Sequence, residues 1–352
     1  MHSFTVTDRF PGGNITVNSI IGNHVSLSIN NRDSQPWFYW AFQVSGAAGR
    51  TLTFTFDGDF LGYWGPAVSH DLLSWHWQEP EAYRADPENR HSFTYTFSEV
   101  ENTVYFAHNM LYNREAFQQM DFMEMHTLCV DSDGTPVPLA SIGEGENVIL
   151  MTARHHACEA PANYMLEGVL RELHQELPDN YKILAVPFVD MAGVVAGDQG
   201  KGRIPHDHNR DYLPISIYPT VRAMKALLAQ ENIKYIFDFH DPCHIGSAND
   251  YTRLVNAYES MREEMNRLSA LYAEEVRIDT SKVCFPFEDG KIMWRKQPLE
   301  GTFSAYCGAL DSVDFVATIE APYFGKQDRM MTQGSYLATG RAFGRAIRRF
   351  IK

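Results

Sequence analysis

The sequence has few cysteines, and their number and spacing do not match a disulfide framework. Its five cysteines are odd in number among 352 residues, and no two of them form a C-x-x-C pair. Structural disulfides are therefore not expected, and the cysteine usage favours a reducing compartment.

Long hydrophobic runs are also missing. No stretch approaches the roughly 20 apolar residues that a membrane-spanning helix needs. The first eight residues contain neither the basic segment nor the apolar segment of a signal peptide. Together with the cysteine usage, these absences predict a cytoplasmic protein that has no membrane partner.

Positive charge is scarce relative to negative charge. The chain has 30 Lys and Arg residues against 44 Asp and Glu residues, which gives a formal net charge of −14. Such a surface repels polyanions, so we expect no nucleic-acid partner. Hydrophobic residues make up 44% of the chain, enough for an ordinary folded core. Neither an internal repeat nor a low-complexity segment is found.

The first third of the chain, residues 1–118, has the pattern of an all-β domain. Apolar and polar residues alternate over short runs such as 25–29, 51–56 and 91–97, and turn-forming residues separate the runs. Several short strands at close spacing are typical of an antiparallel β-sandwich.

The remainder, residues 119–352, has a different pattern, in which apolar strands alternate with helical stretches. This alternation predicts an α/β domain with a mixed sheet. The strands are expected at 148–151, 183–189, 235–239 and 315–319, and the helices at 163–177, 220–229, 251–276 and 335–350.

A short segment, residues 153–161 (ARHHACEAP), lies between the first of these strands and the first of these helices. Chemistry in α/β proteins usually lies at such carboxyl ends of strands. His156 and Glu159, three positions apart, could supply two ligands of a catalytic zinc, whereas His155 lacks a Glu at that spacing. An isolated H-x-x-E is common by chance, and a helix-capping His–Glu pair is the alternative.

Two further strands also end in side chains that could do chemistry. His240 follows the apolar strand 235–239 and is our candidate for a third zinc ligand, with His244 in the next loop as its rival. Glu320 ends the strand 315–319 within the segment TIEAP. A Glu fixed beside a metal without binding it suits a general base for a zinc-bound water.

A polar segment between these strands, residues 205–212, contains Asn209 and Arg210 in tandem. The amide and the planar guanidinium suit the recognition of a small carboxylate. His206 and His208 in the same segment are either additional metal ligands or polar loop residues.

These segments, in this order, resemble the zinc metallocarboxypeptidases of the carboxypeptidase A-like family. The β-rich first part, with FPGGN at 10–14 and WFY at 37–39, resembles that of the cytosolic carboxypeptidase subfamily. The resemblance implies a mixed-sheet α/β/α zinc carboxypeptidase domain over residues 119–352, preceded by the β-sandwich domain. It also implies Zn²⁺ as the cofactor and the C-terminus of a peptide or protein as the substrate.

The resemblance implies a role for each candidate residue of the metal site. His156, Glu159 and His240 would bind the zinc ion. Glu320 would act as the general base and would then pass a proton to the leaving amine.

Substrate binding would fall to the polar segment. Asn209 and Arg210 would hold the C-terminal carboxylate of the substrate. The family also has an arginine that polarises the scissile carbonyl, but Gly200 stands at that position here. Arg203, or alternatively Lys201, is expected to supply this charge.

Two other functions also fit the motifs. One is an amidohydrolase of small N-acyl amino acids, of the aspartoacylase and desuccinylase type, which also uses H-x-x-E and a later histidine. The other is a non-catalytic module that binds zinc or a peptide without turnover.

Overall fold

The structure is a computed structural model. It describes residues 4–33, 37–78, 89–244, 249, 251–255, 257–278, 292–295, 299–326 and 329–351.

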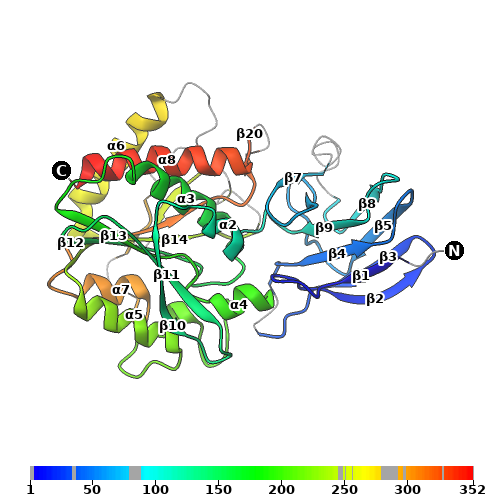
Figure 1. Ribbon diagram of the computed structural model, residues 1–352, viewed down its shortest axis with the longest axis horizontal. Helices are drawn as coiled ribbons and strands as arrows, with labels where there is room; N and C mark the ends of the chain where they lie inside the picture. Colours follow the sequence, from blue (N-terminus) through cyan, green and yellow to red (C-terminus); the bar gives the residue numbers. More distant parts are fainter. Residues whose placement is uncertain are drawn as a thin grey trace.

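The N-terminal part consists of two sheets that pack face to face (Figure 1). The strands of the first sheet, in spatial order, are β1 (Thr5–Thr7), β4 (Ala41–Ser45), β9 (Thr103–Ala107), β6 (Ala67–Ser69) and β7 (Trp75–Trp77). Those of the second are β2 (Thr16–Ile21), β3 (His24–Ser28), β5 (Thr51–Phe56) and β8 (Ser92–Thr96). All neighbouring strands are antiparallel except β3 and β5, which confirms the predicted β-sandwich.

Aromatic side chains fill the space between these two sheets. Leu52, Phe54 and Phe56 alternate with partly exposed threonines along β5, so one face of the strand is buried. Phe54 packs against Phe42 of the opposite sheet, with ring centroids 5.1 Å apart. Each such buried side chain contributes about 1.5–3 kcal/mol of hydrophobic stabilisation.

The C-terminal part is built on a seven-stranded mixed sheet, as the alternating pattern predicted. Its four central strands are parallel and its outer strands are antiparallel. In spatial order they are β10 (Glu124–Val130), β11 (Pro136–Ile142), β13 (Tyr181–Val186), β12 (Asn147–Ala153), β14 (Ile233–His240), β18 (Phe315–Glu320) and β15 (Arg253–Val255).

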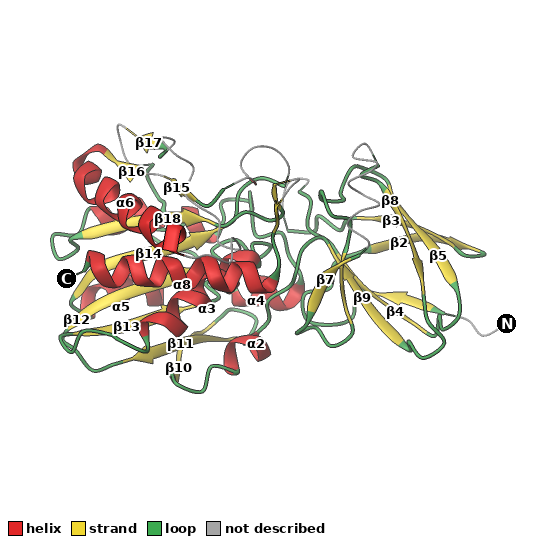
Figure 2. Cartoon of the chain, turned by 90° about the horizontal axis from the view of Figure 1, so that it is seen from above, coloured by secondary structure: helices red, strands yellow, loops and turns green. Residues whose placement is uncertain are grey.

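Helices cover both faces of this sheet (Figures 1 and 2). On one face lie α3 (Pro161–Leu173), α6 (Arg262–Ile278) and α8 (Gln333–Phe350), and on the other lie α5 (Pro219–Gln230) and α7 (Phe303–Gly308). Shorter elements are α2 (Arg114–Gln118), α4 (Met191–Ala196), η1 (His208–Arg210), η3 (Glu259–Met261), β16 (Ala257–Tyr258), β17 (Trp294–Arg295), β19 (Gly325–Lys326) and β20 (Arg329–Met330).

The predicted helix at 251–276 is wrong at its beginning. Residues Arg253–Val255 form the edge strand β15, and Leu254 lies opposite Ile319 of β18. The helix itself, α6, begins only at Arg262. Burial of Leu254 and Val255 against a distant strand outweighs the local helical pattern.

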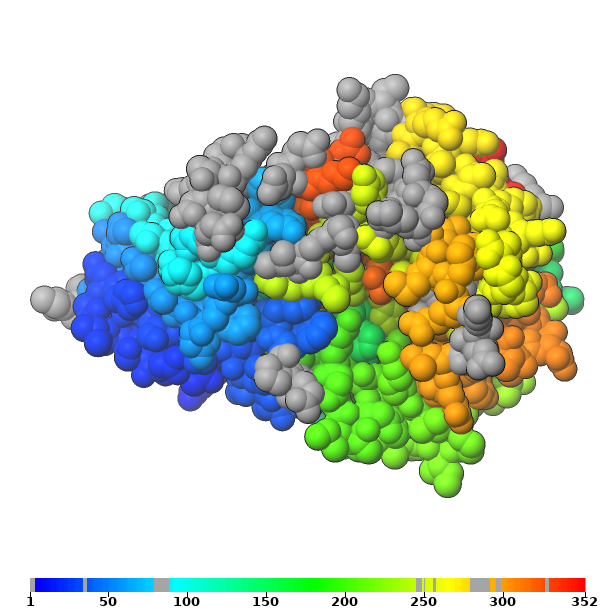
Figure 3. All heavy atoms as spheres, turned by 180° about the vertical axis from the view of Figure 1, so that it is seen from behind, coloured from blue at the N-terminus to red at the C-terminus, as the bar shows by residue number. Residues whose placement is uncertain are grey.

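The two parts of the chain contact each other through buried side chains. Trp64 and Trp77 donate hydrogen bonds from their indole nitrogens to the carbonyls of Phe324 and Met331, at 2.8 and 2.7 Å. Seen from behind, the N-terminal residues (blue) lie against the green segment around residue 200 (Figure 3). The boundary between residues 118 and 119 stays a prediction.

Glu101, which precedes β9 of the sandwich, should make the folding stability of the protein depend on pH. Burial raises the pKa of Glu101, but hydrogen bonds from His70, Tyr95 and Ser98 outweigh burial and bring it to about 2, below the ordinary 4.5. The carboxyl group of Glu101 therefore binds its proton less tightly in the folded state than in the unfolded state. Ionised Glu101 stabilises the fold fully above about pH 4.5, and this contribution is lost as the pH falls towards 2.

We expect Glu101→Gln to lower the free energy of unfolding at pH 7 by about 1.5–3 kcal/mol, the range for hydrogen bonds to charged groups. The deficit relative to the wild type should shrink as the pH falls below 4.5. Urea unfolding at pH 7 and pH 4 measures both quantities. Glu99→Gln, a change at an exposed position two residues away, is the control and should show neither effect.

Candidate metal centre

Three neighbouring parallel strands bring the candidate residues to one edge of the sheet. β12 pairs with β14 and β14 pairs with β18, so the carboxyl ends of all three lie together. His240 is the last residue of β14, and it lies directly opposite Glu320, the last residue of β18. His156 and Glu159 lie between the end of β12 and the start of α3. This is the edge that the sequence predicted.

His156, Glu159 and His240 converge on a common point. The Nδ1 atoms of His156 and His240 lie 3.0 and 2.8 Å from the two carboxylate oxygens of Glu159, and 3.2 Å from each other. One ligand atom from each residue can be chosen so that all three lie within 4.8 Å of one another, and all three side chains are buried. Two imidazole nitrogens and one carboxylate oxygen form a typical donor set for catalytic zinc.

The protonation of these side chains is compatible with a metal. Burial lowers the pKa of His156 to about 4, against the opposing field of Glu159, so its imidazole is neutral at pH 7. Burial would also lower the pKa of His240, but Asp238 and Glu159 outweigh it and raise that pKa well above 6.5. A metal ion must therefore replace a proton on His240, which makes metal binding dependent on pH.

Lys201 is a cation in direct contact with this donor set. Its Nζ lies 2.6 Å from Oε1 of Glu159 and 5.1 Å from the centroid of the Trp37 ring. Burial lowers the pKa of Lys201, but the field of Glu159 outweighs it and the net shift is upward, so the ammonium stays charged.

The donor set lines a cavity with a volume of about 230 Å³. Glu320 and Lys201 line the same cavity as His156, Glu159 and His240. Burial raises the pKa of Glu320, and the nearby ammonium of Lys201 opposes the rise. A carboxylate with a raised pKa is a stronger base at neutral pH, which suits it to accept a proton from water.

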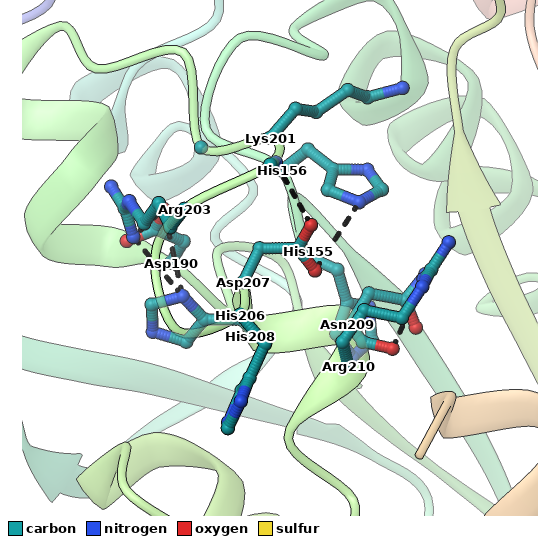
Figure 4. A network of polar contacts seen from close by, with 12 residues as sticks. His155, His156, Asp190, Lys201, Arg203, His206, Asp207, His208, Asn209 and Arg210 are labelled. Atoms are coloured by element: carbon teal, nitrogen blue, oxygen red, sulfur yellow. Dashed lines mark hydrogen bonds and ion pairs between the residues drawn. The ribbon is translucent and has the colours of Figure 1, made fainter. Parts of the chain in front are cut away.

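Asn209 and Arg210 also line this cavity, and both belong to the turn η1 (Figure 4). The Oδ1 atom of Asn209 accepts a hydrogen bond from the backbone of Phe303 at 3.2 Å, which leaves its amide nitrogen as a donor. Arg210 donates to the carbonyl of Asn209, also at 3.2 Å. The cavity therefore combines a donor set for a metal with donors for a carboxylate.

Arg203 does not line this cavity, although it is only two residues from Lys201. Its guanidinium forms ion pairs with Asp33, Asp190 and Asp198 at 3.0, 2.8 and 2.9 Å. In Figure 4 it lies beside Asp190, on the far side of His156 from Arg210. The geometry favours Lys201 over Arg203 as the cation at the site.

The remaining histidines of the predicted polar segment have other contacts. His206 lies 2.7 Å from Asp211, and the ring of His208 stacks on Tyr218 at 3.8 Å. His244, the rival for the third ligand, pairs with the buried His108 at 2.6 Å. In the part of the chain that the structure describes, no group that could hold a metal includes any of these residues.

Sequence reasoning gave neither Asp238 nor His155 a role. Both are buried beside His240, and the three side chains form the second group that could hold a metal in the described part of the chain. The available signal was the carboxylate of Asp238 inside the otherwise apolar strand YIFDFH. A buried charge requires polar partners, so this residue predicts a hydrogen-bonded group nearby.

Comparison with known proteins identifies the class of fold. The metallo-carboxypeptidase of Burkholderia cenocepacia superposes with a TM-score of 0.76 at 18% sequence identity, with 99% of each chain covered. A metallo-carboxypeptidase from Pseudomonas aeruginosa in complex with (2-guanidinoethylmercapto)succinic acid gives a TM-score of 0.75, also at 18% identity and 99% coverage of each chain. The protein therefore has the fold of the metallocarboxypeptidases.

Sequence comparison finds similarity to cytosolic carboxypeptidases over part of the chain. Residues 6–108 match the cytosolic carboxypeptidase N-terminal domain. Cytosolic carboxypeptidase 2 of Danio rerio is 25% identical over 174 residues, which are 43% of this chain and 23% of that protein. An uncharacterised protein of Zymomonas mobilis is 29% identical over 188 residues, which cover 49% of this chain and 47% of that protein. The chain thus spans less than half of these relatives.

Together these findings confirm the resemblance that the motifs indicated. The chain has the fold of the metallocarboxypeptidases, and its first part is similar to the N-terminal domain of cytosolic carboxypeptidases. Among the described residues, no helix is both long and apolar enough to cross a membrane.

Proposed function

We propose that the protein is a zinc-dependent metallocarboxypeptidase that hydrolyses the C-terminal peptide or amide bond of a peptide. The observation that carries this proposal is one cavity that combines His156, Glu159 and His240 with Glu320 and Arg210. We also propose a cytoplasmic location, in keeping with the named relatives.

Zinc would be held by His156, Glu159 and His240, and when bound it would activate a water molecule and polarise the scissile carbonyl. Glu320 would accept a proton from the attacking water and then donate it to the leaving amine. Lys201, whose ammonium reaches the same cavity, would stabilise the negative charge that develops on the carbonyl oxygen.

Asn209 and Arg210 would bind the free carboxylate of the substrate in the same cavity. Their donors would place the last peptide bond of the substrate near Glu320. An enzyme that requires this carboxylate acts on chain ends and not on internal bonds.

The experiment is a measurement of zinc content followed by a screen of peptides with different C-terminal residues. Mass spectrometry should detect the release of single C-terminal residues, and the same peptides with C-terminal amides should be poor substrates. Cleavage of N-acyl amino acids but not of peptides would replace this function with an amidohydrolase. A zinc-loaded protein that is inactive on both sets would be a binding module.

The contribution of Arg210 can be measured separately. We expect Arg210→Met to lower kcat/KM on peptides with a free carboxylate by roughly 10- to 100-fold, because a hydrogen-bonded charge pair with the substrate is lost. Activity on the corresponding amides should change little. Arg341→Met, a change at an exposed position on α8, is the control. An equal loss on acids and amides would contradict the assignment.

A further inference from the structure

A chain of buried hydrogen bonds runs from Tyr212 to His240. The hydroxyl of Tyr212 lies 3.0 Å from Nε2 of His155, and Nδ1 of His155 lies 3.0 Å from Oδ1 of Asp238. Oδ2 of Asp238 in turn lies 2.9 Å from Nε2 of His240. All four side chains are at most 4% exposed, so water cannot replace these partners.

The chemistry of Asp238 fixes the direction of these bonds. An ionised carboxylate can only accept, so both imidazoles must donate to it, His155 from Nδ1 and His240 from Nε2. Thr152 donates a further hydrogen bond to the same carboxylate at 2.6 Å. In the neutral imidazole of His155, Nε2 then carries the lone pair and accepts a hydrogen bond from the hydroxyl of Tyr212.

This direction determines which nitrogen of His240 can bind a metal. Because Nε2 donates to Asp238, the lone pair of the neutral imidazole lies on Nδ1, the atom that faces Glu159 at 2.8 Å. In other metalloproteins, a carboxylate behind a histidine ligand similarly fixes its tautomer and orientation.

Tyr212 connects this chain of bonds to the turn that would bind the substrate carboxylate. It lies two residues beyond Arg210, and its ring packs on Phe303 with centroids 5.0 Å apart. The backbone of Phe303 donates to Asn209. Tyr212 therefore contacts both Phe303, which supports the carboxylate-binding turn, and His155 of the hydrogen-bonded chain.

We propose that Asp238 and His155 are positioning residues that hold His240 in its metal-binding tautomer, with Tyr212 anchoring His155. The proposal rests on the proposed function, because it requires that His240 binds zinc. Replacement of a carboxylate of this kind typically weakens metal binding 10- to 100-fold. A side chain that only fills space would change stability without changing the metal site.

The test uses the full chain and measures zinc affinity by competition with a chromophoric chelator. We expect Asp238→Asn to raise the Kd for zinc by roughly 10- to 100-fold. Tyr212→Phe, which removes only a hydroxyl, should raise it by roughly fivefold. Substitution with Co²⁺ gives a second readout, since the visible absorption of the ion reports the ligand geometry. Both variants should alter that spectrum.

Two controls distinguish positioning from stability. Asp190→Asn changes another fully buried aspartate, one that belongs to the ion pairs of Arg203; it should leave the Kd for zinc unchanged. Tyr164→Phe removes a buried hydroxyl that donates to the carbonyl of Leu111, and it should also leave the Kd unchanged.

The outcomes distinguish failure of this inference from failure of the proposed function. Zinc affinities within twofold of the wild type and an unchanged cobalt spectrum in Asp238→Asn and Tyr212→Phe would overturn the inference while leaving the carboxypeptidase proposal intact. If the wild-type protein itself bound no zinc, both would be overturned. If Asp238→Asn does not fold, Tyr212→Phe and His155→Gln decide the question by the same two measurements.

Discussion

Glu320→Gln is expected to lower kcat on a peptide substrate by roughly 10²- to 10⁴-fold, the range for loss of a general base. The amide has nearly the same shape as the carboxylate but cannot accept a proton from water. Glu320 lies opposite His240 across two parallel strands, so the backbone holds its position and the substitution should not disturb it.

The zinc content of this variant should remain that of the wild type, because the proposed ligands are three other side chains. Metal analysis and steady-state kinetics on the same preparation separate the two quantities. Glu146→Gln is the control, since Glu146 is exposed in the turn before β12, at the opposite end of the strand. Loss of zinc from Glu320→Gln would instead make Glu320 a ligand, and unchanged kcat would exclude it as the base.

The sequence was sufficient to predict that the candidate residues lie together, because neighbouring parallel strands place the residues that follow them at one edge of the sheet. Buried strands are readable as apolar runs, and the polar residue that ends each run must lie at the same edge of the sheet. His240 and Glu320 each end such a run, and the structure places them opposite each other. His156 follows a third run, which forms β12, the other neighbour of β14.

The choice between Lys201 and Arg203 could not be predicted, because it depends on the path of a glycine-rich loop. Gly200 and Gly202 have φ angles of +73° and +63°, which other residues rarely adopt. A Cβ atom at Gly200 would lie 2.2 Å from the backbone nitrogen of Ala157, so only glycine fits against the loop that carries His156. Lys201 therefore reaches Glu159 in the cavity, whereas Arg203, two residues later, pairs with Asp190 outside it.

The partners of buried polar groups were also beyond sequence reasoning. His155 and Asp238 are 83 residues apart, and only the pairing of β12 with β14 brings them within 3.0 Å. The same dependence on distant pairing explains why the strand β15 was predicted as helix. Local patterns predict elements, whereas contacts between elements require the register of the sheet.

Lys201→Met is expected to have opposite effects on turnover and on zinc binding. Loss of the proposed cation at the carbonyl should lower kcat/KM by roughly 10²- to 10³-fold, the range for loss of one oxyanion donor. Affinity for zinc should not fall, and we expect it to rise, because Glu159 no longer has an ammonium 2.6 Å from its Oε1 atom. Lys201→Arg, which restores a positive charge, should recover part of the activity.

Arg203→Met should behave differently, because its guanidinium neutralises buried carboxylates outside the cavity. Removal of one partner of a buried ion pair typically costs 3–5 kcal/mol, so a lower free energy of unfolding is expected, with the affinity for zinc unchanged. Kinetics, zinc competition and urea unfolding on both variants decide between the two cations. If Arg203→Met were fully stable but inactive while Lys201→Met stayed active, the carbonyl-polarising role would belong to Arg203. The reason is that a residue needed only for folding cannot abolish catalysis without lowering stability.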